Sequence, residues 1–103
     1  MKQLAQLKKM LEDEPNDPFL LYSIALQYAD TAPATTISLL QELHAHQPNY
    51  LPAIERLAYL LEEAEDYSSA KIFATKGIAT AQQQNESKTK KELSAFLVNL
   101  DMA

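Results

Sequence analysis

A pattern of apolar and small residues occurs twice in this 103-residue chain, at a spacing of 33 residues. The stretch Leu21-x-x-Ile24-Ala25-x-x-Tyr28 recurs as Ile54-x-x-Leu57-Ala58-x-x-Leu61, and a polar turn and a second amphipathic stretch follow each copy. One helix pair about every 34 residues is typical of stacked helical repeats. Because one such unit cannot bury its apolar side alone, neighbouring units stack and form a curved surface. The spacing therefore predicts a protein that holds another polypeptide.

The composition favours helices throughout, since the chain has a single glycine and few runs of β-branched residues. Asp17-Pro18 has the pattern of a helix start, a carboxylate cap followed by proline at the first helical position. Proline-containing breaks at 14–16 and 47–49 separate other amphipathic stretches. These signals predict about six helices and no strands, over about 2–13, 17–29, 34–46, 51–64, 67–83 and 87–101.

The charge of the chain argues against a nucleic-acid partner. The formal net charge is −5, and the only basic cluster is Lys88, Lys90 and Lys91. Binding to phosphates needs a clustered basic face. The chain also lacks cysteine, which excludes disulfides, thiolate metal sites and a cysteine nucleophile.

Membrane and export signals are also missing from the sequence. No stretch approaches the roughly 18 to 20 apolar residues that a membrane span needs. Lys8 and Lys9 interrupt any apolar core of a signal peptide. We therefore expect no membrane association and a cytoplasmic location.

The repeated residues resemble the tetratricopeptide repeat (TPR) family. Its unit is two antiparallel helices with bulky and small residues at preferred places, which Ile54, Leu57, Ala58 and Ala70 match, and Glu65-Asp66-Tyr67 aligns with its Gly-Asp-Tyr turn. The first copy fits only if its turn is one residue shorter, and it carries Thr36 and Leu43 where small alanines are usual.

The resemblance covers nearly the whole chain and implies an all-α, right-handed α-α superhelix (TPR-like). It implies a single domain over 1–103, with a half-repeat helix at 2–16, repeats at 17–50 and 51–84, and a capping helix at 87–101. Small residues such as Ala25, Ala58 and Ala70 would let two helix backbones approach closely.

No group of residues in the sequence has the pattern of an active site. His44 and His46 are two apart on a predicted helix, so they face different sides and cannot share one metal ion. The acidic run from Glu62 to Asp66 reads as a solvated helix end, and the serines lack a nucleophile-elbow context. With one glycine there is no phosphate-binding loop. We expect no catalysis, no metal and no cofactor.

The resemblance implies a groove lined by the first helix of each pair, with an aromatic and apolar floor and an acidic wall. Such a groove suits a peptide with apolar side chains plus Lys or Arg. Carried over by position, its residues are Phe19, Tyr22, Leu26, Glu55, Tyr59, Glu62, Lys91 and Asn99. Tyr22 and Tyr59 have an alternative role, packing between neighbouring helices.

Two further functions remain open. The edge helices are apolar, and they also suit a structural module that self-associates as a homodimer. The first offers Leu4, Leu7 and Leu11, and the last offers Phe96, Leu97 and Leu100. Alternatively, the helices serve as a spacer within a larger scaffold. The sequence is compatible with either a monomer or a homodimer.

Overall fold

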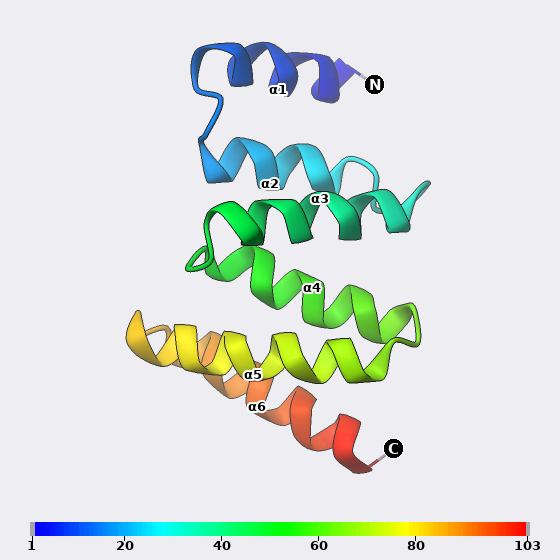
Figure 1. The fold of residues 1–103 in the computed structure, drawn as a ribbon, viewed down its shortest axis with the longest axis vertical. Helices are drawn as coiled ribbons and strands as arrows, with labels where there is room; N and C mark the ends of the chain where they lie inside the picture. The colour runs from blue at the N-terminus through cyan, green and yellow to red at the C-terminus, as the bar shows by residue number, and fades with distance from the viewer. Residues whose placement is uncertain (1, 103) are drawn as a thin grey trace. The chain divides into compact units, whose positions relative to one another are not determined.

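The computed structural model describes residues 2–102, which form helices and turns with no strand. The helices follow one another with short connections (Figure 1). Their bounds are α1 Lys2–Asp13, α2 Pro18–Leu26, α3 Pro33–His46, α4 Leu51–Glu63, α5 Tyr67–Gln83 and α6 Ser87–Met102. The all-α fold class predicted from the sequence is confirmed.

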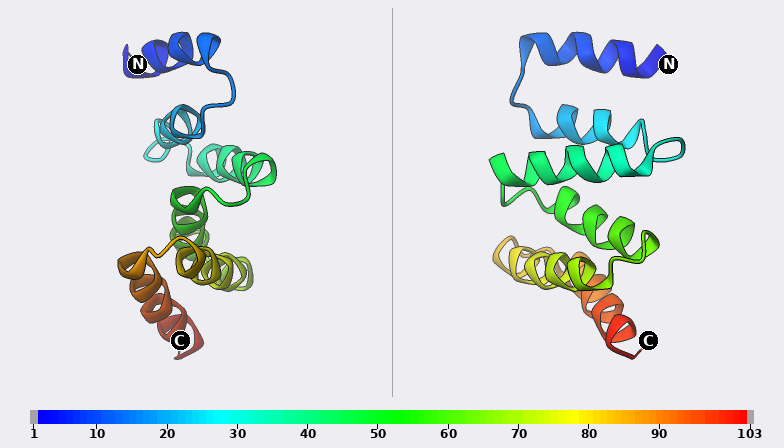
Figure 2. Two further views of the ribbon diagram at one scale, coloured as in Figure 1. Left: turned by 90° about the vertical axis from the view of Figure 1, so that its left-hand side faces the viewer. Right: turned by 45° about the vertical axis from the view of Figure 1, so that its right-hand side comes forward.

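The chain divides into two compact units. The first is Met1–Pro48 with α1 to α3, and the second is Asn49–Ala103 with α4 to α6. We call them unit 1 and unit 2 and describe each by itself. Unit 1 contains the α2/α3 hairpin with α1 beside α2, and unit 2 contains the α4/α5 hairpin with α6 beside α5 (Figure 2).

Helix α2 begins as predicted and ends earlier than predicted. The Asp17 carboxylate accepts hydrogen bonds from the backbone N–H of Phe19 at 2.9 Å and of Leu20 at 3.4 Å. The expected end near Ala29 was wrong, because α2 ends at Leu26. The next N–H groups, those of 27–29, each bond to the carbonyl three residues back, which tightens the chain into a turn.

The α2/α3 hairpin of unit 1 closes on the small residue Ala25, which is fully buried. Thr36 of α3 is fully buried as well, and its hydroxyl donates a 2.7 Å hydrogen bond to the carbonyl of Ala25. Leu40 and Leu43 extend the contact along α3. By contrast, none of the residues of α1 is buried.

Unit 2 has the larger core, built where α4, α5 and α6 meet. Ala58 of α4, Ala74 of α5 and Leu93 of α6 are all fully buried in one cluster. Gly77 of α5 allows a close approach, since a Cβ there would lie 2.5 Å from Leu93 Cδ1 and 3.3 Å from Ile54 Cγ2. The small positions predicted from the repeat therefore lie where helices touch.

Left-handed residues end two helices of unit 2. Glu65 has φ 64° after α4, and Asn85 has φ 59° after α5. The next N–H in each turn, of Asp66 and of Glu86, bonds back to the carbonyls of Leu61 and Ala81. This pattern satisfies carbonyls that the helix end would leave unpaired.

A glutamine side chain closes the open end of each hairpin. Gln47 Nε2, after α3, donates to the Asn16 carbonyl before α2 at 2.7 Å. Gln84 Nε2, after α5, donates to the Asn49 carbonyl before α4 at 2.6 Å. We call these two bonds the glutamine clasps. The same contact occurs in both hairpins, so the two repeats are alike in their loops as well as in their helices.

Candidate functional site

Unit 2 contains a hollow of about 740 Å³, a volume within the range of ligand pockets. Side chains from all three helices of the unit line it. They are Tyr59, Glu62 and Glu63 from α4, Tyr67 and Lys71 from α5, and Phe96, Asn99 and Leu100 from α6. We call this the unit 2 hollow.

An aromatic pair forms one wall of the unit 2 hollow. The rings of Tyr59 and Phe96 have centroids 4.9 Å apart and an interplanar angle of 88°, an edge-to-face contact. This geometry is favourable for aromatic rings and fixes α4 against α6 through side chains that are only half buried. Tyr59 therefore packs between helices and also lines the hollow.

The phenol of Tyr59 lies in a negatively charged surrounding. Its hydroxyl donates a 3.2 Å hydrogen bond to Glu55 Oε2, one turn earlier on α4. Partial burial, the charge of Glu55, that hydrogen bond and the charge of Glu92 together raise the pKa of Tyr59 from 10.0 to about 12. The phenol is neutral at physiological pH, and the carboxylates around it create a potential that favours cations.

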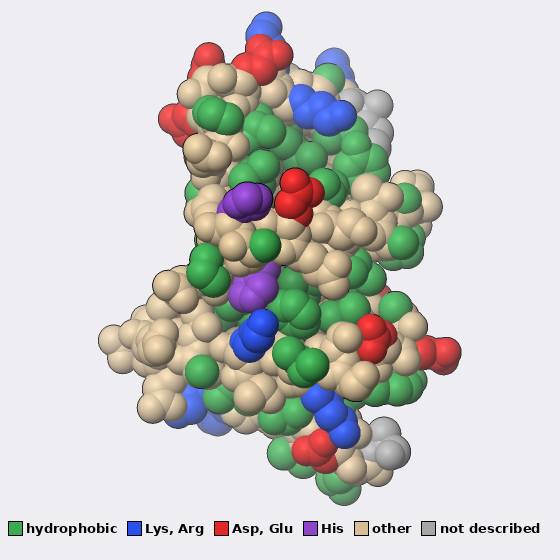
Figure 3. All heavy atoms as spheres, in the orientation of Figure 1, with side chains coloured by type: hydrophobic (Ala, Val, Ile, Leu, Met, Phe, Trp, Pro, Cys, Tyr) green, Lys and Arg blue, Asp and Glu red, His purple; other side chains and the backbone are tan. Residues whose placement is uncertain are grey.

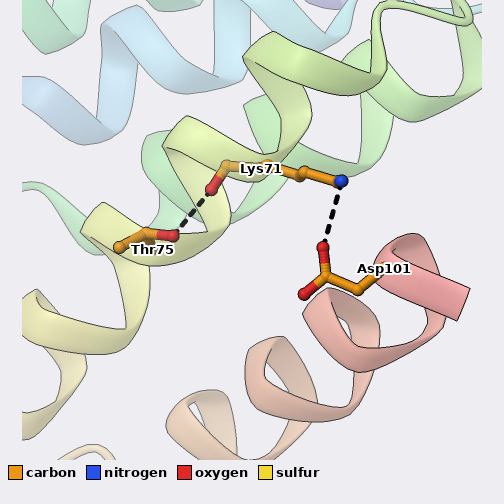
Figure 4. Close-up of polar contacts among 3 residues, drawn as sticks. All are labelled: Lys71, Thr75 and Asp101. Carbon is orange, nitrogen blue, oxygen red and sulfur yellow. Dashed lines mark hydrogen bonds and ion pairs between the residues drawn. The ribbon is translucent and has the colours of Figure 1, made fainter.

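One ion pair lies at the edge of the unit 2 hollow. Lys71 Nζ of α5 is 3.0 Å from Asp101 Oδ1 of α6, as Figure 4 shows. The Lys71 backbone carbonyl accepts a 2.8 Å hydrogen bond from the Thr75 hydroxyl. Both charged side chains are more than two-fifths exposed, so the pair contributes little to stability. It does determine where the lysine ammonium lies.

The residues predicted for the groove lie on the predicted helices, and the unit 2 hollow brings part of them together. It contains Tyr59, Glu62 and Asn99, and Glu55 adjoins it through the Tyr59 hydrogen bond. Lys91 is exposed on α6 and does not line it. In unit 1, α2 carries the other three, Phe19 largely exposed and Tyr22 and Leu26 half buried.

Sequence reasoning missed Phe96, Tyr67, Lys71 and Leu100 as residues of the hollow. Phe96 was assigned to the apolar packing stripe of the last helix, and Tyr67 to the turn before the fifth. A signal was present for Phe96, because it is three residues before Asn99 and thus on the same side of a helix.

A second hollow, of about 700 Å³, lies within unit 1. Leu11, Leu21, Leu39 and Leu43 make it mainly apolar. On the face in Figure 3, hydrophobic side chains gather between α1 and α3, with acidic and histidine side chains beside them. No residue predicted for the groove lines it.

Residues 2–102 contain no group of three or more His, Asp or Glu side chains placed to hold a metal ion. His44 is half buried and His46 exposed, on the last turns of α3. Within the same range, no helix combines the length and apolar character that crossing a bilayer requires.

Comparisons with known proteins find similar folds among solved structures. No family model matches the sequence, and no curated protein matches it. The solution structure of a tetratricopeptide repeat domain protein from Salinibacter ruber aligns with a TM-score of 0.78 at 24% identity, over 84% of this chain and 88% of that chain.

Two further solved structures are similar. The crystal structure of a Salinibacter ruber tetratricopeptide repeat domain protein has a TM-score of 0.76 at 23% identity, over 82% of this chain and 96% of that chain. A Bordetella parapertussis protein has a TM-score of 0.80 at 24% identity, over 96% of this chain and 87% of that chain. These likenesses, together with the helices above, show that the chain has a fold similar to that of tetratricopeptide repeat domains.

Proposed function

Because the chain has the fold of tetratricopeptide repeat domains, which commonly mediates protein–protein interaction, we propose that it binds a polypeptide segment without catalysis. The bound segment contacts unit 2, along α4, the first helix of the repeat at 51–84, and α6, the last helix. Residues 1–103 act in this proposal as one adaptor module, and the expected cytoplasmic location stays a prediction.

The observation that carries this proposal is the partly exposed Tyr59–Phe96 pair in the unit 2 hollow. Aromatic side chains are enriched at interfaces, because they offer a large rigid contact area at low entropic cost. An apolar side chain of a bound segment can pack on these rings while Asn99, at the same hollow, offers hydrogen bonds to its backbone.

The charges of the site support a partner with basic side chains. Glu55 lies one turn before Tyr59 on α4. Glu62 and Glu63 follow at the C-terminal end of the same helix and line the hollow with Tyr59. Opposite charge on the partner steers the encounter and fixes the register of binding. A segment with apolar and basic residues therefore fits this proposal better than an acidic one.

A peptide-display selection against the protein tests the proposal. We expect recovered peptides to combine apolar and basic residues, and their binding to be lost in the double variant Glu55→Lys with Glu62→Lys. The helix content should stay nearly unchanged, because both carboxylates are only partly buried and the one side-chain hydrogen bond lost is that from Tyr59 to Glu55.

A matched control carries the same change of charge away from the site. Glu12→Lys with Glu14→Lys alters two exposed side chains in or next to α1 and should leave peptide binding intact. Equal loss in both double variants would mean that only net charge matters, and peptides that bind the first double variant undiminished would contradict the proposed site.

Self-association is the second candidate function, favoured by apolar side chains exposed on the edge helices. Met10 of α1 is 55% exposed, and Val98 and Met102 of α6 are 56% and 80% exposed. A symmetric dimer would bury one of these faces. Light scattering over a range of concentrations tests this, with a stable mass twice 11.6 kDa expected for the dimer.

A further inference from the structure

Resting on the proposed function, we propose that the unit 2 hollow is a subsite for one arginine side chain of the bound polypeptide. The guanidinium lies against Tyr59 and Phe96 and pairs with Glu62 and Glu63. The Lys71–Asp101 ion pair keeps the carboxylates available by holding the protein's own cation aside.

The first support is the distribution of charge in the hollow. Glu62 and Glu63 line it, and within residues 2–102 neither carboxylate takes part in an ion pair. The one lysine in the lining, Lys71, is bound to Asp101 instead, as the dashed line in Figure 4 marks. The hollow thus contains two carboxylates whose charge a ligand cation can neutralise.

The second support is the aromatic wall. An edge-to-face pair leaves ring surface that the partner ring does not cover, and Tyr67, 48% exposed, adds a third ring to the lining. Cations are attracted to ring faces. The same unit already uses this contact, since Lys76 Nζ lies 5.1 Å from the centroid of the Phe73 ring.

Arginine fits this combination better than lysine. A guanidinium is planar and weakly hydrated, stacks on aromatic rings and offers a fork of donors to carboxylates, whereas an ammonium is a compact and strongly hydrated charge. The phenol of Tyr59 is neutral and presents a ring without competing charge, because burial, Glu55 and Glu92 raise its pKa to about 12.

Asp101 has a positioning role in this proposal. Lys71 lines the same hollow as Glu62 and Glu63, so a Lys71 released from Asp101 can turn towards them and compete with the ligand. Asp101→Asn is therefore expected to weaken arginine binding, although Asp101 does not touch the guanidinium. Lys71→Met should restore binding in the Asp101→Asn background.

The test is an NMR titration of the full chain with N-acetyl-arginine methylamide as the probe. The expected result is shift changes at Tyr59, Glu62, Glu63 and Phe96, with weaker changes for the lysine analogue and none for the citrulline analogue. Citrulline has nearly the shape of arginine without its charge. Equal changes with citrulline, or changes confined to other residues, would overturn the proposal.

Variants separate the residues of the subsite. Glu62→Gln with Glu63→Gln should lower the affinity for the arginine probe by at least about fivefold. This is the size expected when the guanidinium loses its carboxylate partners and is held less well against the aromatic rings. Glu86→Gln, at an exposed residue before α6, is the matched control and should change nothing. If Asp101→Asn binds the probe as well as the unaltered protein, the positioning role is wrong.

Peptides from the display selection distinguish this inference from the proposed function. Replacing each arginine of a selected peptide by citrulline should weaken its binding at one position, and Glu62→Gln with Glu63→Gln should remove that difference. Peptides that bind equally well with citrulline contradict the arginine subsite and leave peptide binding standing. A probe that maps to the hollow when no peptide binds would contradict the proposed function instead.

Discussion

The hydroxyl of Thr36 donates a 2.7 Å hydrogen bond to the backbone carbonyl of Ala25, and both residues are fully buried. Thr36 occupies a position where tetratricopeptide repeats usually carry a small residue, and it is larger than alanine. The bond joins α3 to α2 at Ala25, one residue before α2 ends. A departure from the family pattern thus becomes a bond between the two helices of unit 1.

Replacing this hydroxyl by a methyl group should destabilise unit 1. Thr36→Val keeps the shape of the side chain and removes the donor, so we expect a loss of about 1 to 2 kcal/mol in the free energy of unfolding. Denaturant unfolding followed by circular dichroism measures this. Thr35→Val, at the exposed neighbour, should change stability by less than about 0.5 kcal/mol; similar losses in both would show that the bond is unimportant.

Adding a methyl group at Gly77 should also destabilise the protein. Alanine favours a helix over glycine by about 1 kcal/mol, but overpacking a filled core costs about 1 to 3 kcal/mol. The new Cβ would lie 2.5 Å from Leu93 Cδ1. Leu93 is fully buried, so the side chains around it leave it little room to shift. Gly77→Ala should therefore lower the melting temperature, and a rise would mean that Leu93 adopts another rotamer at no cost.

Glycine in place of Glu65 should stabilise the protein. Glu65 has φ 64°, a left-handed conformation that costs a residue with a side chain about 1 kcal/mol more than glycine. We expect Glu65→Gly to raise the free energy of unfolding by about 0.5 to 1 kcal/mol. Asn85→Gly, at φ 59°, is the comparison, and it should gain less because asparagine tolerates this conformation.

The ionisation of Tyr59 should depend on its fold and on Glu55. The pKa of Tyr59 is raised from 10.0 to about 12, first by burial and then by Glu55 and Glu92. The unfolded chain therefore loses this proton at lower pH than the folded protein, so the contribution to stability is full below pH 10.0 and is lost as the pH rises towards about 12.

Absorbance of tyrosinate during an alkaline titration measures this. Tyr59→Phe should remove the tyrosinate step near pH 12, and Glu55→Gln should move that step to lower pH, because the negative charge next to the phenol is lost. If the titration curve of Glu55→Gln matches that of the unaltered protein, the Glu55–Tyr59 bond does not exist in solution.

The helical fold and its small contact residues could be predicted because both follow from local pattern. The spacing of apolar residues marks helix faces, and Ala25, Ala58 and Ala70 are fully buried as expected for helix contacts. The end of α2 could not be predicted in this way, since its last turn tightens through bonds to the carbonyl three residues back and its apolar pattern continues to Tyr28.

The unit 2 hollow was only partly predictable for a different reason. The lining that α6 contributes depends on the rotation of this helix about its own axis. The apolar residues of α6, Leu93, Phe96, Leu97 and Leu100, form one stripe, and the sequence does not indicate which of them contacts α4. Leu93 is fully buried and Phe96 only half, so the structure gives the first to the core and the second to the hollow.

The glutamine clasps differ in kind from the contacts of the hollow. Each joins a neutral amide to a backbone carbonyl, at 2.7 Å and 2.6 Å, so neither partner titrates and no counterion screens them. The closure of each hairpin is therefore indifferent to acidity and ionic strength. In the proposed complex, added salt should therefore weaken the arginine contact and leave both glutamine clasps formed.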